Sequence, residues 1–239
     1  MRPATLLSEA SQMQAAPSEM RVAALFSGGK DSSYATFVAQ HYGWDVACLV
    51  TAFSASPESY MFHVPAIELT RLAAEALGLP LIEVATPPEP EAELLPLQEA
   101  LAELGIDGIV SGAVASEYQR RRLDQICQAI GIKSFAPLWH KDPRELLREM
   151  VDEGFEIVIA GCAAEGLDES WLGRRLDAKA LEDLDRLHAK YGIHVGGEGG
   201  EYESLVIAGP HMERRIRVEY KKVWRVHSGH IVVKKAWLE

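Results

Sequence analysis

The sequence is poor in cysteine, contains no long apolar run and has no excess of basic residues. Its three cysteines, Cys48, Cys127 and Cys162, lie far apart among 239 residues and form no Cys-x-x-Cys pair. This number and spacing predict neither a disulfide framework nor a zinc site, and they fit a reducing cytoplasm. No stretch approaches the roughly 20 apolar residues that cross a bilayer. We therefore expect a cytoplasmic protein with no membrane partner.

Acidic side chains outnumber basic ones. The 35 Asp and Glu residues against 24 Lys and Arg residues give a formal net charge of -11. Because Lys and Arg contacts to phosphate dominate nucleic-acid affinity, this balance argues against a nucleic-acid partner. A hydrophobic fraction of 48% and a charged fraction of 25% are those of an ordinary globular protein. They exclude disordered, collagenous and coiled-coil chains.

Patterns typical of strands and helices alternate through the first half of the chain. We expect strands at 21–26, 45–51, 81–85 and 107–111, separated by helices at 33–41, 65–77, 93–104 and 117–130. Strands that are separated by helices form parallel βαβ units, with helices on both faces of the sheet. This half is therefore predicted to be a parallel α/β domain.

The second half is less regular and predicts a smaller α+β domain. We expect helices at 143–152 and 178–191, strands at 156–160 and 205–208, and a final hairpin of 214–226 and 230–237 that turns at Ser228-Gly229. The first 20 residues lack the apolar core of a signal peptide. We divide the chain into a tail at 1–20, a nucleotide-binding domain at 21–136 and a substrate-binding domain at 137–239.

The segment from Ser27 to Ser32 (SGGKDS), between the first strand and the first helix, has the composition of a phosphate-binding loop. Its two glycines let the backbone approach a ligand closely, and the helix N-terminus behind it favours an anion. Lys30 adds a full positive charge, and we expect its side chain to be exposed. The segment is not a Walker A loop, because Ala24 stands where that motif needs glycine and Asp31 follows the lysine.

Two further segments carry unusual charge. Gly197 to Ser204 (GEGGEYES) combines acidic and glycine residues, which suits either a site for Mg²⁺, ammonium or an alkylated amine, or an acidic surface turn. Ser116 to Arg122 (SEYQRRR) follows the fourth strand, at the edge of an α/β sheet where ligands bind. Arg120 and Arg122 there suit a phosphate or carboxylate, or a solvated helix face with ion pairs.

Together these segments resemble one family, the diphthine–ammonia ligases, or diphthamide synthases, of the N-type ATP pyrophosphatase (PP-loop) group. The resemblance rests on ALFSGGKDSSYA (Ala24–Ala35), MFHVP (Met61–Pro65), SGAVASEYQRRR (Ser111–Arg122), FAPLW (Phe135–Trp139) and GEGGEYESLV (Gly197–Val206). It implies that the first domain has the HUP fold of adenine-nucleotide α-hydrolases.

The resemblance also implies an activity. Family members are ATP-dependent amide ligases that convert diphthine on translation elongation factor 2 to diphthamide with ammonium. The reaction passes through an acyl-adenylate and releases AMP and pyrophosphate, with ATP and Mg²⁺ as cofactors. The alternatives are another PP-loop enzyme, acting on a different carboxylate or on tRNA, and an ATP-binding sensor without turnover. Homo-oligomerisation is left open.

The resemblance assigns roles to residues of this chain. The catalytic residues are expected to be Lys30, Asp31 and Glu201, with Asp31 also the ligand of Mg²⁺. The ATP-binding residues are expected to be Ser27, Gly28, Gly29, Lys30, Asp31, Ser32, Thr51 and Gly112, the last two lining the adenosine pocket. The substrate-binding residues are expected to be Tyr118, Gln119, Arg120, Arg122, Glu198, Gly199, Gly200, Glu201 and Glu203.

Overall fold

A computed structural model of the protein describes residues 20–54, 68–87, 92 and 94–239. Nearly all of the expected N-terminal tail and the whole MFHVP segment (Met61–Pro65) lie outside these residues. No helix within the described part is long and apolar enough to cross a membrane.

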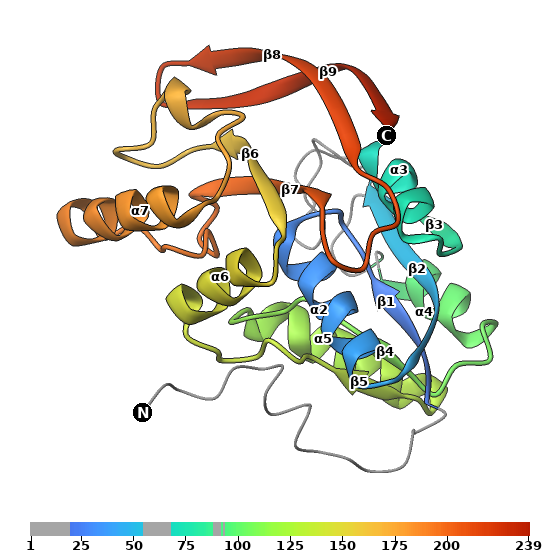
Figure 1. Cartoon of the computed structure of the whole chain (residues 1–239). Helices are drawn as coiled ribbons and strands as arrows, with labels where there is room; N and C mark the ends of the chain where they lie inside the picture. The colour runs from blue at the N-terminus through green and yellow to red at the C-terminus, as the bar shows by residue number, and fades with distance from the viewer. Residues whose placement is uncertain (1–19, 55–67, 88–91, 93) are drawn as a thin grey trace.

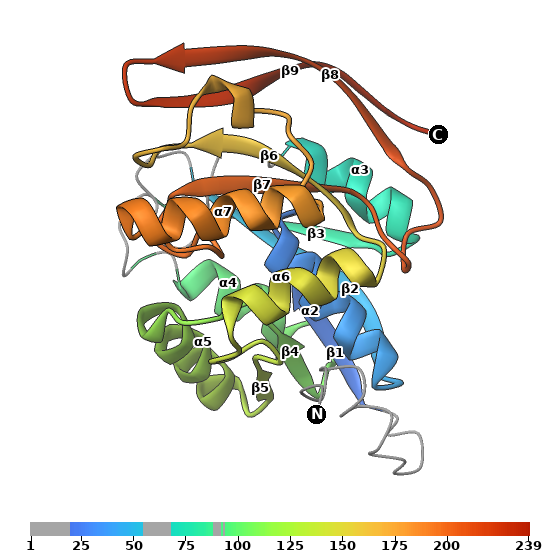
Figure 2. The same ribbon diagram turned by 60° about the vertical axis from the view of Figure 1, so that its left-hand side comes forward.

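The N-terminal half forms a parallel sheet of five strands in the order β3-β2-β1-β4-β5 (Figures 1 and 2). The strands are β1 (Arg21–Leu25), β2 (Asp45–Ser54), β3 (Leu81–Thr86), β4 (Gly108–Val110) and β5 (Lys133–Phe135). The helices are α2 (Lys30–His41), α3 (Glu68–Leu77), α4 (Leu94–Ala102) and α5 (Glu117–Ile130). The predicted parallel α/β domain is confirmed, but β5 lies outside the predicted strands.

Helices cover both faces of this sheet because its strands alternate in side-chain direction. Val22 and Ala24 of β1 belong to the buried cluster that includes α2 and α3. Ala23 and Leu25 belong to a second cluster, which includes α4 and α5. The strand order reverses between β1 and β4, so the carboxyl ends of these two strands form a topological switch point, where α/β sheets bind ligands.

The C-terminal half contains an antiparallel sheet in the order β7-β6-β9-β8. Its strands are β6 (Glu156–Cys162), β7 (Tyr202–Ala208), β8 (Ile216–Arg225) and β9 (Ser228–Leu238). The helices are α6 (Pro143–Asp152) and α7 (Ala178–Tyr191), with a short 3₁₀ helix, η1 (Glu169–Trp171). The α+β prediction for this half is confirmed.

The final hairpin turns two residues earlier than expected. Its turn is Val226-His227, with Val226 at φ 45°, and Ser228 and Gly229 already belong to β9. Gly229 pairs with Trp224, and a Cβ at position 229 would overlap the indole ring. The glycine that indicated a turn is therefore required for close packing inside the hairpin.

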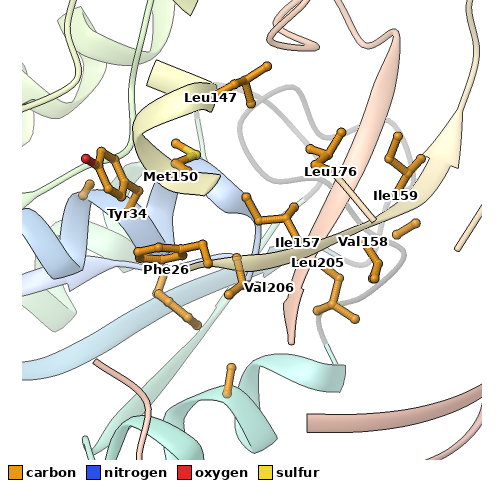
Figure 3. Packing of buried hydrophobic residues seen from close by; sticks show 14 of the residues in the cluster. Phe26, Tyr34, Leu147, Met150, Ile157, Val158, Ile159, Leu176, Leu205 and Val206 are labelled. Carbon is orange, nitrogen blue, oxygen red and sulfur yellow. The ribbon is translucent and has the colours of Figure 1, made fainter. Parts of the chain in front are cut away.

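One hydrophobic core joins the two halves. Figure 3 shows Ile157 of β6 and Met150 of α6 lying near Phe26 and Tyr34, which come from the N-terminal half. All four side chains are buried and belong to one cluster. The C-terminal half therefore packs directly against the helix that follows β1.

Candidate active site

The candidate site lies at the switch point, where the loop after β1 meets the segment after β4. A Cβ at Gly112 would lie 2.6 Å from the carbonyl carbon of Asp31 and 2.6 Å from the amide nitrogen of Ser32. Only glycine allows the segment after β4 to approach the first turn of α2 so closely. Gly112 is thus in contact with the backbone of the phosphate loop, and its predicted place in an adenosine pocket stays a prediction.

The loop of Ser27, Gly28 and Gly29 is held in shape by its own hydrogen bonds. The Ser27 amide donates to Ser32 Oγ at 3.1 Å, and the Ser32 hydroxyl donates to the Gly29 carbonyl at 3.2 Å. Gly28 has φ +79°, which favours glycine. Because α2 begins at Lys30, three residues before the expected start, Lys30 lies in the first turn. The loop and helix N-terminus form a cradle that suits phosphate.

Lys30 is buried, with 5% of its surface exposed, so the expectation of an exposed side chain is wrong. Its ammonium donates to Asp31 Oδ2 at 2.6 Å and lies 3.9 Å from Glu198 Oε1. Burial lowers the pKa of Lys30, but the negative charge of Asp31 together with Tyr202 and Glu198 raises it above its usual value. The lysine therefore remains charged in the interior of the site.

The C-terminal half completes the cradle. The amide of Lys30 donates to Ser204 Oγ at 3.1 Å, and the amide of Val206 donates to the carbonyl of Gly28 at 3.0 Å. Strand β7 therefore lies along the phosphate loop. The contact between Lys30 and Ser204 was not predicted, because no spacing rule relates two residues 174 positions apart.

Glu198 and Glu201 have different surroundings in the acidic loop. Glu201 Oε1 accepts a hydrogen bond from the His194 amide at 2.9 Å, and Oε2 accepts one from the Gly199 amide at 2.9 Å. Glu198 instead faces Lys30, with its side chain 24% exposed. Burial raises the pKa of Glu198 to about 7; repulsion from Asp31 adds to this effect and Lys30 opposes it. Glu201 thus shapes the loop, and Glu198 points toward the charged centre.

Two further residues of the acidic segment, Gly200 and Glu203, shape the turn before β7 and the strand itself. Gly200 has φ +82°, which allows the turn before β7. Glu203 belongs to β7 and pairs in register with Gly161 of β6. A Cβ at Gly161 would lie 3.3 Å from Glu203 Oε2, so glycine leaves space for this carboxylate.

A divalent cation fits the cradle through Asp31. The Oδ1 atom of Asp31 is buried and has no hydrogen-bond partner in the described part of the chain. Mg²⁺ is usually bound through one or two carboxylates together with substrate phosphates. No group of three or more His, Cys, Asp or Glu residues suited to a metal occurs among the described residues. The donor set therefore suits a cation that is held mainly by phosphate oxygens.

Thr51 is placed next to this centre by strand β2. Thr51 is 3% exposed and lies inside β2, which continues to Ser54 instead of ending at Thr51 as expected. It follows Val50, whose carbonyl accepts a hydrogen bond from the Phe26 amide at 2.8 Å. Thr51 therefore lies beside the start of the phosphate loop.

Helix α5 carries the predicted substrate-binding residues Tyr118, Gln119, Arg120 and Arg122. Ser116 Oγ caps this helix by accepting from the Gln119 amide at 3.3 Å. Arg122 is buried, and Tyr118 is 45% exposed. These residues connect to the phosphate loop through the segment that contains Gly112.

Comparisons with known proteins identify the family of the chain. The model of the diphthamide synthase N-terminal domain matches residues 20–134, and that of the C-terminal domain matches residues 142–238. The human protein named diphthine–ammonia ligase is 34% identical, over 92% of this chain and 90% of its own length. The zebrafish protein of that name is 33% identical, over 84% and 87%.

A fission yeast protein with the same name is 32% identical over 89% of this chain, which spans 38% of that longer protein. The two family models together cover most of the chain, and they divide at the segment between β5 and α6. The chain belongs to the diphthamide synthase family.

Proposed function

We propose that this protein is an ATP-dependent diphthine–ammonia ligase, acting on diphthine of translation elongation factor 2. The observation that carries the proposal is the buried, charged Lys30 at the N-terminus of α2, enclosed by Glu198 and Ser204 of the acidic segment. A phosphate cradle that is completed by an acidic loop suits a reaction between ATP and a cationic acceptor. Passive ATP sensing would leave the acidic loop without a function, and the net charge of -11 argues against a tRNA substrate.

The reaction has two steps. A carboxylate oxygen of the acceptor attacks the α-phosphorus of ATP, the bond to the β-phosphate breaks, and pyrophosphate leaves. Ammonia then attacks the acyl carbon, the bond between that carbon and the AMP oxygen breaks, and the nitrogen loses one proton to solvent as the amide forms. Lys30 and the amides at the start of α2 stabilise the charge that develops on the leaving pyrophosphate.

Asp31 is the residue proposed to hold Mg²⁺, which would supply charge neutralisation at the phosphates of ATP. Its buried Oδ1 atom provides a free acceptor for this purpose within the described residues. Lys30 occupies the other oxygen, Oδ2, and so fixes the orientation of the carboxylate. Asp31 can therefore accept a hydrogen bond from Lys30 through Oδ2 and bind the cation through Oδ1.

The acidic loop is proposed to position the cationic substrate. Glu198 directs a carboxylate toward the centre, where it suits ammonium or the quaternary ammonium of diphthine. Glu201 keeps the loop in shape through two backbone hydrogen bonds. We propose that residues 21–136 form the nucleotide-binding domain and residues 137–239 the substrate-binding domain. We also propose that the protein works in the cytoplasm, where its acceptor functions.

The direct test combines the protein with ATP, Mg²⁺, ammonium and elongation factor 2 that bears diphthine. Intact-mass analysis is expected to detect the change from carboxylate to amide, with equal amounts of AMP and pyrophosphate. Lys30→Met is expected to abolish AMP formation, because it removes the charge at the leaving group while keeping an apolar stem of similar length. Bound ATP that stays intact in the complete mixture would favour the sensor alternative.

A further inference from the structure

Three consecutive arginines on α5 have different surroundings. Arg120 Nε lies 3.7 Å from Asp124 Oδ2, and Arg121 Nε lies 3.6 Å from Glu117 Oε2. The Arg120 side chain is 42% exposed and the Arg121 side chain is 78% exposed. Arg122 is 8% exposed, and within the described residues no carboxylate pairs with it. The buried arginine is therefore the one that lacks a counter-ion.

The unpaired atoms of Arg122 form a single edge of its guanidinium group. Nη1 donates to the hydroxyl of Tyr118, whose ring centroid lies 4.7 Å from the guanidinium carbon. Nε and Nη2 are buried and have no hydrogen-bond partner in the described part of the chain. The N–H groups of these two atoms point the same way, and this edge binds two oxygens of one carboxylate or phosphate.

A buried cation without a counter-ion destabilises the free protein. Here the uncompensated charge lies in the second turn of α5, next to Leu123, which packs under the sheet. The helix follows directly from the segment in which Gly112 contacts the phosphate loop. The start of α5 therefore belongs to the edge of the sheet where substrates bind.

We propose that the Nε and Nη2 edge of Arg122 binds two oxygens of a substrate oxyanion, either the acceptor carboxylate or a phosphate of ATP. Tyr118 is a positioning residue, because its hydroxyl and ring hold the guanidinium in the orientation that leaves this edge open. This inference rests on the proposed function and names a residue that binds the reacting groups.

The test compares Arg122→Met with Arg121→Met, a matched control at an exposed position that is paired on the helix surface. Arg122→Met is expected to leave the ligand-free thermal stability unchanged or raised, because it removes an uncompensated buried charge. Calorimetry with MgATP is expected to give an affinity about tenfold weaker or more if the edge binds phosphate. If the edge binds the carboxylate, the MgATP affinity stays the same and the KM for the acceptor rises by a similar factor.

Tyr118→Phe keeps the ring and removes the hydroxyl. It is expected to weaken MgATP binding or to raise the acceptor KM, whichever of the two Arg122→Met changes, by a smaller factor. In protein with nitrogen-labelled arginine, the Nε–H signal that Arg122→Lys removes is expected to shift when the responsible substrate is added. Arg121→Met is expected to change none of these quantities.

Equal MgATP affinity and equal acceptor KM in wild-type and Arg122→Met protein would overturn the assignment. A marked loss of ligand-free stability in Arg122→Met would also overturn it, since that indicates a purely structural arginine. If the wild-type protein forms no amide, the proposed function fails, and the response of the Arg122 Nε–H signal to MgATP alone then decides the assignment.

Discussion

At the scale of single residues, chemically identical side chains in one short loop have different tasks. Glu198 and Glu201 are three positions apart, and composition alone did not distinguish them. The structure distinguishes them by what their oxygens contact, since Glu201 accepts two backbone hydrogen bonds and Glu198 lies near the Lys30 ammonium. The catalytic role expected for Glu201 stays a prediction, but its geometry favours loop organisation.

Replacing each carboxylate by its amide should separate these two tasks. Glu201→Gln replaces one acceptor by a donor that faces a backbone N–H, so we expect a loss of about 1–3 kcal/mol in the free energy of unfolding. Glu198→Gln breaks no such bond, so we expect near-normal stability and a higher KM for the acceptor or for ammonium. Chemical denaturation and steady-state kinetics check both. A stable, inactive Glu201→Gln beside a fully active Glu198→Gln would contradict this division.

His211 makes the stability of the protein depend on pH. Its ring packs against Phe37 and Phe155, and both ring nitrogens are buried without a hydrogen-bond partner among the described residues. Burial lowers the pKa of His211 to about 4. The unfolded chain therefore binds a proton more readily than the folded one, and the stability contributed by the neutral ring is lost as the pH falls from about 6.5 toward 4.

We expect the free energy of unfolding to fall by about 2 kcal/mol between about pH 7 and about pH 5 through this group alone. His211→Phe removes the titrating ring and should flatten this part of the stability profile. His227→Gln, at the exposed hairpin turn, is the matched control and should leave the slope unchanged. If the free energy of unfolding depends on pH identically in His211→Phe and in the wild type, His211 is not the cause of the pH dependence.

At the scale of elements, the sequence predicts best where local capping chemistry marks both ends. Helix α5 begins after the Ser116 cap and ends at Gly131, with φ 76°, and its predicted range is confirmed. The ranges of α6 and α7 are confirmed as well, because Asp142 and Asp177 accept hydrogen bonds from the first amides of these helices. These signals lie within a few residues of the boundary that they set.

Elements that depend on distant partners were predicted less well. Strand β5 has three residues, too few to show the alternation of a strand, and it exists because it pairs with β4. Helix α2 begins at Lys30, three residues before the predicted start. Its first turn contains Lys30 and Asp31, which form an ion pair in the site, and this charged pair carries no apolar pattern typical of a helix. The contact of Ser204 with Lys30 likewise depends on how β7 packs across the loop.

The close approach of β4 and α2 should be sensitive to one methyl group. In Gly112→Ala the new Cβ would lie 2.6 Å from backbone atoms of Asp31 and Ser32, which have no flexible end that can move away. We expect a loss of about 1–3 kcal/mol in stability, together with weaker ATP binding because the phosphate loop must shift. Thermal unfolding and calorimetry with MgATP measure the two effects.

The control is Gly43→Ala, where nothing lies within 4 Å of the added Cβ but φ is +77°. This variant measures how much stability is lost when alanine adopts a positive φ without a steric clash. It should leave ATP affinity unchanged. An ATP affinity for Gly112→Ala equal to that of the wild type would contradict the close-approach argument.

At the scale of the whole molecule, the active site depends on the two halves being packed as one body. The phosphate loop comes from the N-terminal half, while Glu198 and Ser204 come from the C-terminal half, and the core around Phe26 and Ile157 fixes their relation. The sequence predicted the two halves and their fold classes. It did not predict their common core, because packing between segments far apart leaves no local pattern.

The burial of the three cysteines indicates which compound supplies the amide nitrogen. An enzyme that takes nitrogen from glutamine needs a second centre with its own nucleophile, commonly a reactive cysteine. All three cysteines of the chain are buried and free. Burial raises the pKa of Cys48 above its usual value, that of Cys127 to about 11 and that of Cys162 to about 12. At neutral pH these thiols are protonated and therefore poor nucleophiles.

We therefore predict that free ammonium, and not glutamine, supplies the amide nitrogen. Protein, MgATP and diphthine-bearing acceptor are incubated with either ammonium chloride or ammonia-free glutamine, and amide formation is followed by intact mass. Product is expected with ammonium alone. The triple variant Cys48→Ala, Cys127→Ala, Cys162→Ala tests the thiols directly, because it should keep ammonium-dependent activity as long as it stays folded. Amidation from glutamine that a thiol-alkylating reagent blocks would show instead that one of these cysteines becomes exposed and reactive during turnover.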